Sequence, residues 1–415
     1  MSELGTLGTK KLPRSAIVIG AGVVGVATAY ALARRGVAVT ILEKADGPAQ
    51  GASFANGAQL SYCYTEALAS PALLRRIPVL ALGLDPAFRL NPRLNVDSIG
   101  WLIRFMMNST EGRFQANTLA GLALGLEARL AMQELLDRHH LDFDHETPGK
   151  MLIYENVDAF ASSRKMIELK RKNGAVQEAL SPAEAIALEP ALLARKEGFV
   201  GAVYAAQEAV GDPRRFCEAM LPLLAKEYGV DIRLNTRVSN WKEGRKSVTL
   251  STSAGEHLDA EQIVLCAGIE ARLHLKRLGL GSALMAMKGY SFTAPRGETA
   301  PSMSITDVAR KIVFCPLGGN IRVAGLAELG ARNTEIDQRR LKSLTDAAAA
   351  ALPKAADYAA VQGGWAGLRP MTANSLPIMR RTSPRVTINI GHGMLGWTYA
   401  MGSAERVAHL MEEWA

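Results

Sequence analysis

The feature that most constrains this chain is a glycine triplet, Gly20, Gly22 and Gly25, set between two apolar segments near the start of the sequence. Ala16 to Ile19 is a short apolar run typical of a buried strand, and Val37 to Leu42 is a second such run beyond an apolar stretch of helical length. A strand, a glycine turn, a helix and a second strand form the βαβ unit that binds dinucleotides. The triplet therefore predicts a Rossmann-like unit.

Each glycine of the triplet has a distinct part in that unit. Gly20 permits the tight turn out of the strand, Gly22 lets the backbone approach a pyrophosphate, and Gly25 lets helix and strand pack closely. The pyrophosphate then faces the free N–H groups of the helix N-terminus. Glu43 ends the second strand, 18 residues after Gly25, where its carboxylate can accept hydrogen bonds from a ribose diol. The predicted cofactor contacts in this part also include Val23, Val24 and Lys44.

Two observations favour FAD over NAD as the dinucleotide. The triplet lies at the N-terminal end, and a later apolar strand ends in Ala267 and Gly268, which let backbone come close to a flavin nucleotide. The segment from Gly391 to Thr398 opens the last predicted helix, whose N-terminus could stabilise negative charge on a reduced flavin. Within it, His392 is either a proton-handling group or a histidine that only completes hydrogen bonds. The predicted cofactor contacts here are Gly393, Met394, Leu395, Gly396, Trp397 and Thr398.

The length and the order of the predicted elements indicate two domains. The chain has 415 residues, which is more than one compact core accommodates. We expect an α/β (α+β) fold with a Rossmann-like FAD-binding domain and a discontinuous substrate-binding domain rich in antiparallel sheet. The predicted ranges are 14–85, 201–280 and 363–415 for the first domain, and 86–200 and 281–362 for the second.

The net charge of +8 suits an anionic partner, such as a phosphate-bearing cofactor, an acidic substrate or an anionic membrane surface. The basic residues are dispersed, so we expect no nucleic-acid partner. The uncharged run Ala16 to Ala33 mimics a secretory signal or a membrane span, but its spaced glycines and the strand after it favour a buried strand and helix. The cysteines form no Cys-x-x-Cys pair and indicate a reducing compartment. We expect a cytoplasmic protein.

One histidine- and aspartate-rich cluster invites a metal assignment. His139 to Glu146 holds several ligand types, but its alternation with Leu141 and Phe143 fits an exposed turn that enters a strand. Structural metal sites usually pair their ligands at a defined spacing across two elements. We therefore expect no metal.

An arginine in a rigid apolar frame is the candidate substrate anchor. Arg369 lies within Gly364 to Thr372, between Leu368 and Pro370. Its planar fork suits a carboxylate, which it can bind through two parallel hydrogen bonds. An ordinary structural pair with a glutamate explains the same pattern equally well.

Taken together, these motifs resemble the D-amino-acid-oxidase superfamily of flavoproteins, and most closely the small-subunit family of bacterial D-amino acid dehydrogenases. The resemblance covers nearly the whole chain, and the motifs in this order are specific to the superfamily. The matching segments are Gly20–Gly25, Ser53–Gln59, Lys288–Ser291, Ile321–Gly325 with Ala327–Glu328, Gly367–Thr372 and Gly391–Gly393 with Leu395–Thr398.

The resemblance implies roles for single residues. It makes Arg369 the residue that binds the substrate carboxylate, and it places Tyr290 over or beside the substrate pocket. Val238 would contact the adenine region of FAD through its backbone. Together with Arg369, Tyr290 and His392 are the candidate catalytic residues. The loop under the flavin would contribute Ser53, Asn56, Gln59 and Leu60.

The chain also departs from the family pattern. Where the family usually has Thr-Pro-Asp-Gly, this chain has Thr372-Ala373-Asn374-Ser375, and Met394 replaces a smaller residue. These positions are expected near flavin and substrate, so the preferred side chain stays open, and a cyclic substrate such as D-proline or hydroxy-D-proline is an alternative. No cysteine lies near Met371, where related sarcosine oxidases link their flavin, so we expect non-covalent FAD.

The resemblance implies oxidative deamination of free D-amino acids, with a hydride passing from Cα to flavin N5. The imino acid would then hydrolyse to a 2-oxo acid. The expected partners are an amino acid and a quinone-type electron acceptor, with peripheral association at the inner face of the bacterial inner membrane. The alternatives are a glycine- or sarcosine-type oxidase that uses O2, and a subunit of a larger amino-acid dehydrogenase complex.

Overall fold

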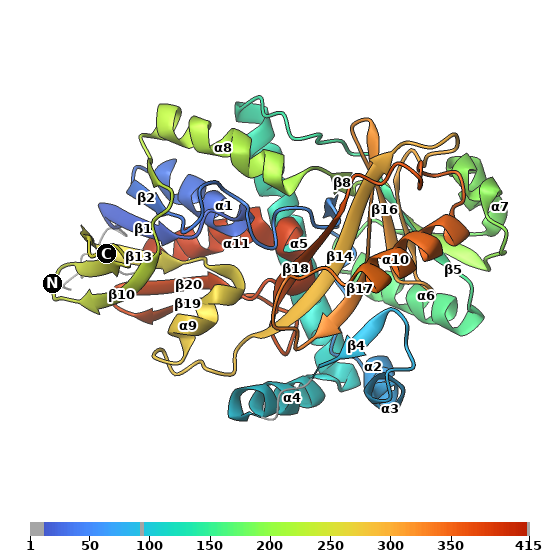
Figure 1. The fold of residues 1–415 in the computed structure, drawn as a ribbon, viewed down its shortest axis with the longest axis horizontal. Coiled ribbons are helices and arrows are strands. Elements are labelled where there is room, and N and C mark those ends of the chain that lie inside the picture. The colour runs from blue at the N-terminus through green and yellow to red at the C-terminus, as the bar shows by residue number, and fades with distance from the viewer. Residues whose placement is uncertain (1–11, 92–94, 413–415) are drawn as a thin grey trace, which may run out of the picture.

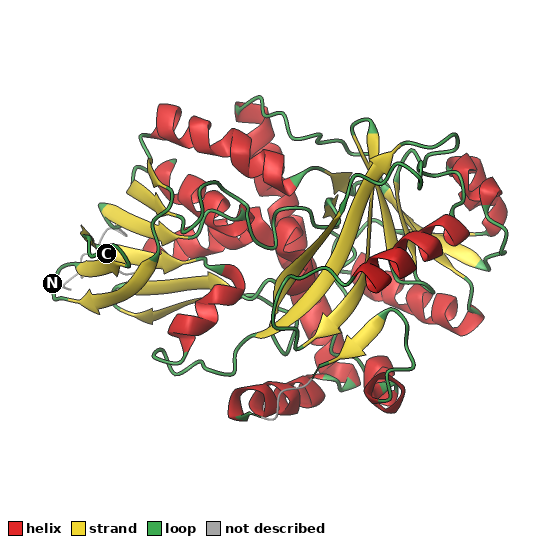
Figure 2. Ribbon diagram, viewed as in Figure 1, coloured by secondary structure: helices red, strands yellow, loops and turns green. Residues whose placement is uncertain are grey.

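The computed structural model describes residues 12–91 and 95–412. Its strands gather in two groups with helices between and around them (Figures 1 and 2). We call the group that contains the glycine triplet the Rossmann half, and the other the antiparallel half. Residues 1–11, and residues 413–415 of the predicted FAD-binding range, lie outside the described residues.

The Rossmann half is built on a mainly parallel sheet with the order β19-β20-β13-β1-β2-β9. Its strands are β1 (Ser15–Ile19), β2 (Ala38–Leu42), β9 (Asp231–Arg233), β13 (Gln262–Leu265), β19 (Ile378–Ser383) and β20 (Val386–Ile390). β1 pairs in parallel with both β2 and β13. The predicted βαβ unit is confirmed, because α1 (Val23–Ala33) connects β1 to β2.

Apolar side chains cover both faces of this sheet, as expected for parallel strands. Ala16 and Val18 of β1 pack with the helices, whereas Ile17 and Ile19 pack on the opposite face. The helical face carries α1, α8 (Pro213–Tyr228) and α11 (Gly396–Glu412). The other face carries an antiparallel meander of β10 (Val238–Glu243), β11 (Val248–Thr252) and β12 (His257–Ala260), with a 3-10 helix at Gly268–Ala271 and α9 (Arg272–Leu275).

The antiparallel half holds a larger sheet with the order β18-β14-β17-β16-β15-β5-β7-β6, and β4 pairs with β17. Its strands are β4 (Phe88–Leu90), β5 (Lys150–Tyr154), β6 (Glu178–Leu180), β7 (Gly201–Ala205), β14 (Met285–Pro295), β15 (Ser304–Asp307), β16 (Ile312–Leu317), β17 (Asn320–Leu329) and β18 (Gly364–Met371). Around it lie α6 (Val157–Arg171), α7 (Pro182–Leu188), the 3-10 helix Pro190–Ala194 and α10 (Gln338–Ala351).

Two connecting regions complete the fold. A short ladder of β3 (Gln59–Leu60) and β8 (Ala209–Val210) lies between the halves, and α5 (Glu111–Arg138) packs along α11. At the lower edge of Figure 1, α2 (Pro71–Arg75), α3 (Ile77–Ala81) and α4 (Val96–Asn108) lie below the strands. This region has a small core of its own, which includes Leu80, Phe88, Trp101 and Phe105.

The predicted domain ranges place three elements in the wrong half. β7 pairs with β5 and β6, and β18 pairs with β14, so both belong to the antiparallel half, not to the predicted FAD-binding ranges. In contrast, α5 was predicted within the substrate-binding domain but packs along α11. The partners of these elements lie far away in sequence, and a local pattern cannot reveal them.

Candidate active site

A cavity of about 1440 Å³, open mouth included, lies at the carboxyl ends of β1 and β13, where the two halves meet. Its lining extends from the glycine triplet of the Rossmann half to Arg369 of the antiparallel half, so a ligand that fills it contacts both halves. Among the predicted site residues, those that line it are Gly20, Gly22, Val23, Val24, Glu43, Lys44, Ser53, Asn56, Val238, Ala267, Gly268, Arg369, His392, Gly393, Met394, Gly396 and Trp397.

The glycine triplet forms a cradle in which two of the three positions, Gly20 and Gly25, have no room for a side chain. Gly20 has a φ of +107°, and a Cβ atom there would lie 2.8 Å from the carbonyl oxygen of Cys266. A Cβ atom at Gly25 would lie 1.8 Å from the carbonyl oxygen of Gly20, so this glycine serves the close packing of helix and strand. Gly22 borders the cavity as the N-cap of α1, which leaves helical N–H groups facing the space where a pyrophosphate fits.

Glu43 is held at the end of β2 by backbone N–H groups. Its Oε2 atom accepts a hydrogen bond from the N–H of Ala21 at 2.7 Å, and its Oε1 atom accepts one from the N–H of Ala45 at 3.0 Å. The side chain is buried, but its carboxylate borders the cavity. A fixed carboxylate in this place suits a ribose diol.

A buried acceptor in the cavity wall also fits FAD. The Oδ1 atom of Asn389, on β20, has no hydrogen-bond partner among the described residues, whereas its Nδ2 atom donates to Thr28 and Ser403. A buried polar atom without a partner is rare, and one that borders a ligand cavity calls for a donor from the ligand. The N–H and hydroxyl groups of a flavin nucleotide are donors of this kind, so the residues present fit the cofactor.

Arg369 extends from β18 into the cavity without a protein partner. Among the residues that the structure describes, no hydrogen bond or ion pair involves its guanidinium group. Burial without a compensating carboxylate lowers the pKa of Arg369 to about 10, so the group is still charged at neutral pH. The sequence left open a structural pair with a glutamate, and the described residues show no such pair. The arrangement suits an incoming carboxylate.

Gly289 makes the space that this guanidinium group occupies. β14 and β18 are antiparallel, with Gly289 opposite Gly367, two residues from Arg369. A Cβ atom at Gly289 would lie 2.3 Å from Nη2 and 2.5 Å from Cζ of Arg369. A glycine inside a strand often marks a close approach of another group. Here the group that approaches is the arginine side chain.

His392 is buried at the inner wall, where its Nε2 atom lies 2.9 Å from Oγ of Ser403. Burial lowers the pKa of His392 to about 3. The imidazole is therefore neutral under ordinary conditions. This geometry favours the second of the two interpretations, a histidine that completes hydrogen bonds.

The expected position of Tyr290 beside the substrate pocket is wrong. Its hydroxyl group donates to Oε1 of Glu328 at 3.0 Å, and its ring packs in the core between the large sheet and α10. The strand register shifts between Gly289 and Tyr290 in the pairing of β14 with β17. Because neighbouring residues of a strand face opposite sides, the glycine faces Arg369 and the tyrosine faces away.

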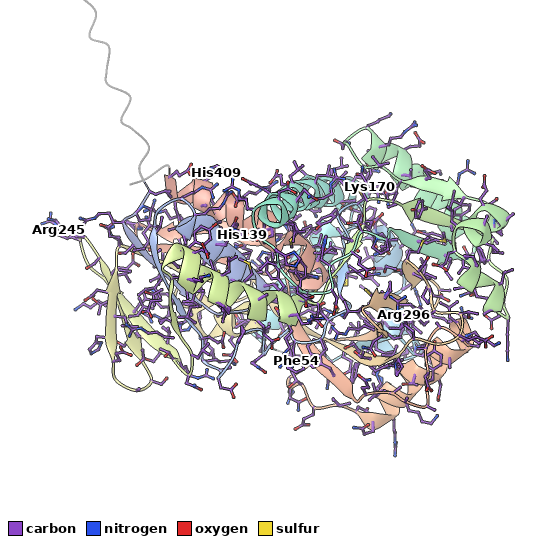
Figure 3. All side chains as sticks on the ribbon, turned by 90° about the horizontal axis from the view of Figure 1, so that it is seen from above. Phe54, His139, Lys170, Arg245, Arg296 and His409 are labelled. Carbon is purple, nitrogen blue, oxygen red and sulfur yellow. The ribbon has the colours of Figure 1, made fainter. Side chains whose placement is uncertain are left out.

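Five other predicted cofactor residues do not border the cavity. Gly25 has the packing role described above, and Leu395 belongs to the 3-10 helix Gly393–Leu395. Gln59 accepts a hydrogen bond from Nζ of Lys150 at 3.1 Å, Leu60 is buried in the core, and Thr398 accepts one from the N–H of Ser61 at 3.0 Å. Lys150 and Ser61 thus belong to a polar layer behind the flavin loop, whose Phe54 lies near the middle of the molecule in Figure 3.

Sequence reasoning missed several residues of the cavity wall. Arg237 and Glu270 form an ion pair at 3.3 Å, and Glu270 also pairs with Lys44. Asn389 is the third residue of the cavity wall that the sequence did not indicate. None of the three belongs to a motif, and a single charged or amide residue outside a motif gives no signal of its own.

The cluster from His139 to Glu146 has structural roles. Oδ2 of Asp142 and Oδ2 of Asp144 pair with Arg215 at 2.7 and 2.5 Å, Phe143 is fully buried, and His139 contacts the hydroxyl group of Tyr228. Within residues 12–91 and 95–412, no group of three or more ligand-type side chains could hold a metal ion.

Comparison with known proteins agrees with this geometry. A family model described as FAD dependent oxidoreductase (DAO) matches residues 15–410. D-amino acid dehydrogenase 2 of Ralstonia nicotianae is 38% identical over 407 residues, which is 95% of this chain and 95% of that protein. A protein of the same name from Pseudomonas aeruginosa is 35% identical over 400 residues, 94% of this chain and 93% of its own.

Solved structures of low identity share the fold. Glycine oxidase from Geobacillus kaustophilus has a TM-score of 0.75 at 20% identity, with 97% of this chain and 95% of that chain covered. L-proline dehydrogenase from P. horikoshii has a TM-score of 0.74 at 17% identity, with 96% and 93% covered. With the family match over nearly the whole chain and the fitting cavity, the cofactor is FAD, and this chain belongs to the DAO family of FAD-dependent oxidoreductases.

Proposed function

We propose that the protein dehydrogenates free D-amino acids at the Cα–N bond, and that the imino acid formed hydrolyses to a 2-oxo acid and ammonia. The observation that carries this proposal is the charged guanidinium group of Arg369, which faces the cavity and has no carboxylate partner among the described residues. The relatives named D-amino acid dehydrogenase support the choice of substrate class.

In this proposal, the chain mainly positions its ligands. The N-terminus of α1, Glu43 and the segment from Gly393 to Trp397 would hold FAD, and bound FAD supplies the acceptor for the hydride that leaves Cα. Arg369 would bind the substrate carboxylate through two charge-assisted hydrogen bonds and so fix which face of Cα meets the acceptor. The pKa of about 3 makes His392 a weak base, and the hydroxyl group of Tyr290 is bonded to Glu328, so neither side chain is suited to accept a proton and orientation carries the main part of the catalysis.

We further propose that electrons pass to a quinone-type acceptor and that the protein associates peripherally with the inner face of the bacterial inner membrane. The dehydrogenase names of the relatives support an acceptor other than O2. None of the described helices has the length and apolar character needed to cross a bilayer. A peripheral contact needs no such helix.

Anaerobic reduction of the holoenzyme by a panel of D- and L-amino acids tests the proposed activity. D-Amino acids, with D-proline and hydroxy-D-proline among them, should bleach the flavin absorbance faster than their L-enantiomers. Reduced enzyme exposed to air should reoxidise slowly, whereas a soluble quinone should reoxidise it at once.

Other results would overturn the proposal. Bleaching by glycine or sarcosine alone, followed by rapid reoxidation in air with peroxide formed, would identify an amine oxidase. Bleaching by no free amino acid would instead indicate a subunit whose substrate site needs a partner chain.

A further inference from the structure

One edge of the molecule exposes an unusual concentration of large apolar side chains. Of the seventeen that are exposed among the described residues, nine lie within α2 to α4 and the loop after α3. We call this set the α2–α4 face; it consists of Leu74, Val79, Leu82, Leu84, Val96, Ile99, Ile103, Met106 and Met107. Part of this face, from Ile77 to Leu84, is an apolar stretch with a proline at Pro78. In Figure 1 these elements form the lower edge of the molecule.

Helix α4 is apolar on two opposite sides. Trp101 and Phe105 point inward and are buried in the small core that α2, α3 and β4 share. Ile99, Ile103 and Met106, spaced by four and three residues, form a second stripe on the exposed side. A surface helix needs only one apolar stripe to pack against its protein, so the second stripe requires another apolar surface.

The exposed charges on this face are mostly positive. Residues 71–108 contain neither lysine nor glutamate, and their acids are Asp85 and Asp97. Asp85 is buried and pairs with Arg76 at 2.7 Å and with Lys311 at 2.7 Å. Arg75, next to Leu74, and Arg89 are exposed in the same stretch of the chain. An apolar surface bordered by arginines is complementary to a bilayer that contains anionic lipids.

The inner side of α4 contacts the strand that carries the substrate arginine. The indole N–H of Trp101 donates to the carbonyl oxygen of Met371 at 2.9 Å, and Met371 lies two residues after Arg369 on β18. The α2–α4 face is therefore one helix away from the proposed substrate site. An acceptor dissolved in the lipid would meet the protein on this side.

We propose that the α2–α4 face docks on the surface of an anionic lipid bilayer, with the side chains of Ile99, Ile103 and Met106 in contact with the acyl region. The evidence for docking is the exposed apolar side chains and arginines of this face. That the membrane also supplies a lipid-soluble electron acceptor rests on the proposed function. The remaining occupant for such a face, a second copy of this chain, is an outcome of the test.

Flotation of the holoenzyme with vesicles tests this docking. Binding to phosphatidylcholine vesicles with about 30% phosphatidylglycerol should exceed binding to phosphatidylcholine alone, and salt should weaken it. The double variant Ile103→Asn/Met106→Asn should bind at least tenfold more weakly. Arg75→Gln should reduce binding about fivefold, as expected for one basic residue near an anionic surface. Leu130→Asn on α5 is the control, since Leu130 is even more exposed than Ile103 and Met106 but lies outside this face, and it should bind normally.

Each other result would overturn the docking. Absent binding, or binding that the double variant retains in full, would show that this face does not meet lipid. Self-association of the wild type that the double variant abolishes, without vesicle binding, would make the face an interface between copies. Turnover of a D-amino acid with a soluble dye is measured in parallel, because it tests the proposed function and should be the same in all variants.

Discussion

Two shielded arginines of the antiparallel half have opposite electrostatic surroundings. Arg195 is almost completely buried, with its Nη2 atom 2.7 Å from Oε1 of Glu155 and its Nη1 atom 3.0 Å from Oδ2 of Asp307. Arg310 joins the same carboxylates and extends the network. Arg369 faces the cavity and has no carboxylate near it among the described residues. Arg195 directly follows the 3-10 helix Pro190–Ala194, and Arg369 lies on β18. Only the guanidinium group of Arg369 still lacks an anion.

This difference separates a charge that stabilises the fold from one that is available to a ligand. A buried guanidinium group that lacks a partner carries a desolvation cost, and a bound carboxylate can offset that cost. The cost is tolerated at Arg369 because the side chain borders a cavity and is not sealed in the core. We therefore expect replacements of the two arginines to act on different quantities.

The largest effect is expected for Arg195→Ala, and it should appear in stability. Removal of Arg195 leaves Asp307, which is nearly inaccessible to solvent, with Arg310 as its remaining cationic partner among the described residues. Loss of one partner of a buried pair costs about 3–5 kcal/mol in the free energy of unfolding. Denaturant titration of the holoenzyme measures this change. Unchanged stability together with a loss of kcat/KM per bound flavin would reverse the assignment of the two arginines.

Arg369→Ala should leave the fold and the flavin content near normal and lower kcat/KM. Loss of a charge-assisted pair with a carboxylate costs about 2–5 kcal/mol. That corresponds to a decrease of roughly 30-fold to several-thousand-fold. Arg369→Lys should recover part of the activity, because an ammonium group keeps the charge but lacks the planar fork. Flavin loss and lower thermal stability with normal kcat/KM per flavin would instead indicate a structural arginine.

His392 should make folding stability depend on pH without acting in proton transfer. Its folded-state pKa of about 3 lies below the ordinary value of 6.5. The unfolded chain therefore binds the proton first, and stability is lost as the pH falls below 6.5, by roughly 1.4 kcal/mol per pH unit from this group. At pH 5 that amounts to about 2 kcal/mol. His392→Asn should remove this part of the difference between denaturation at pH 5 and at pH 8. A ring that titrates near pH 6.5 by NMR would contradict the buried neutral state.

Gly289→Ala sharpens the comparison, because it disturbs Arg369 without removing its charge. The added methyl group would occupy the position of the guanidinium group, which can move because it ends a flexible side chain. We expect KM to rise about tenfold, which corresponds to ~1.4 kcal/mol of lost substrate binding, and the free energy of unfolding to stay nearly unchanged. In the Arg369→Ala background the same replacement should have almost no further effect. Equal losses in both backgrounds would show that the glycine acts independently of the arginine.

The sequence predicts those parts of the site whose chemistry is local. The glycine triplet and Glu43 define a turn and a strand end within about thirty residues, and Arg369 lies in a rigid frame of its own. The fold class and the two kinds of sheet follow from the same short-range patterns. Asn389, Arg237 and Glu270 could not be found, since they meet at the cavity only through pairing of distant strands.

The misplaced Tyr290 has a different physical cause. Its motif, Lys288 to Ser291, was recognised, but the side of the sheet that each residue faces depends on strand register. Which face of β14 borders the cavity is set by its pairing with β17 and β18, and partners so far away in sequence cannot be read from the residues alone. The boundaries of the two halves failed for a related reason, because β7 and β18 are assigned by their hydrogen-bonded neighbours.

The smallest effect is expected for Tyr290→Phe. The hydroxyl group lies 3.0 Å from Oε1 of Glu328, and the same oxygen also accepts from Nε of Arg340 at 3.1 Å. Loss of the tyrosine bond leaves that carboxylate paired, so we expect a decrease of only about 1 kcal/mol in the free energy of unfolding. Because the phenol ring packs away from Arg369, kcat/KM should change by less than about twofold. A tenfold change would correspond to ~1.4 kcal/mol in the activation free energy. Steady-state kinetics and denaturation of the same preparation measure both quantities. A tenfold loss of kcat with normal stability would show that this hydroxyl group takes part in the reaction. Tyr290 would then act on the ligand, as proposed for Arg369, and would not be a structural residue like Arg195.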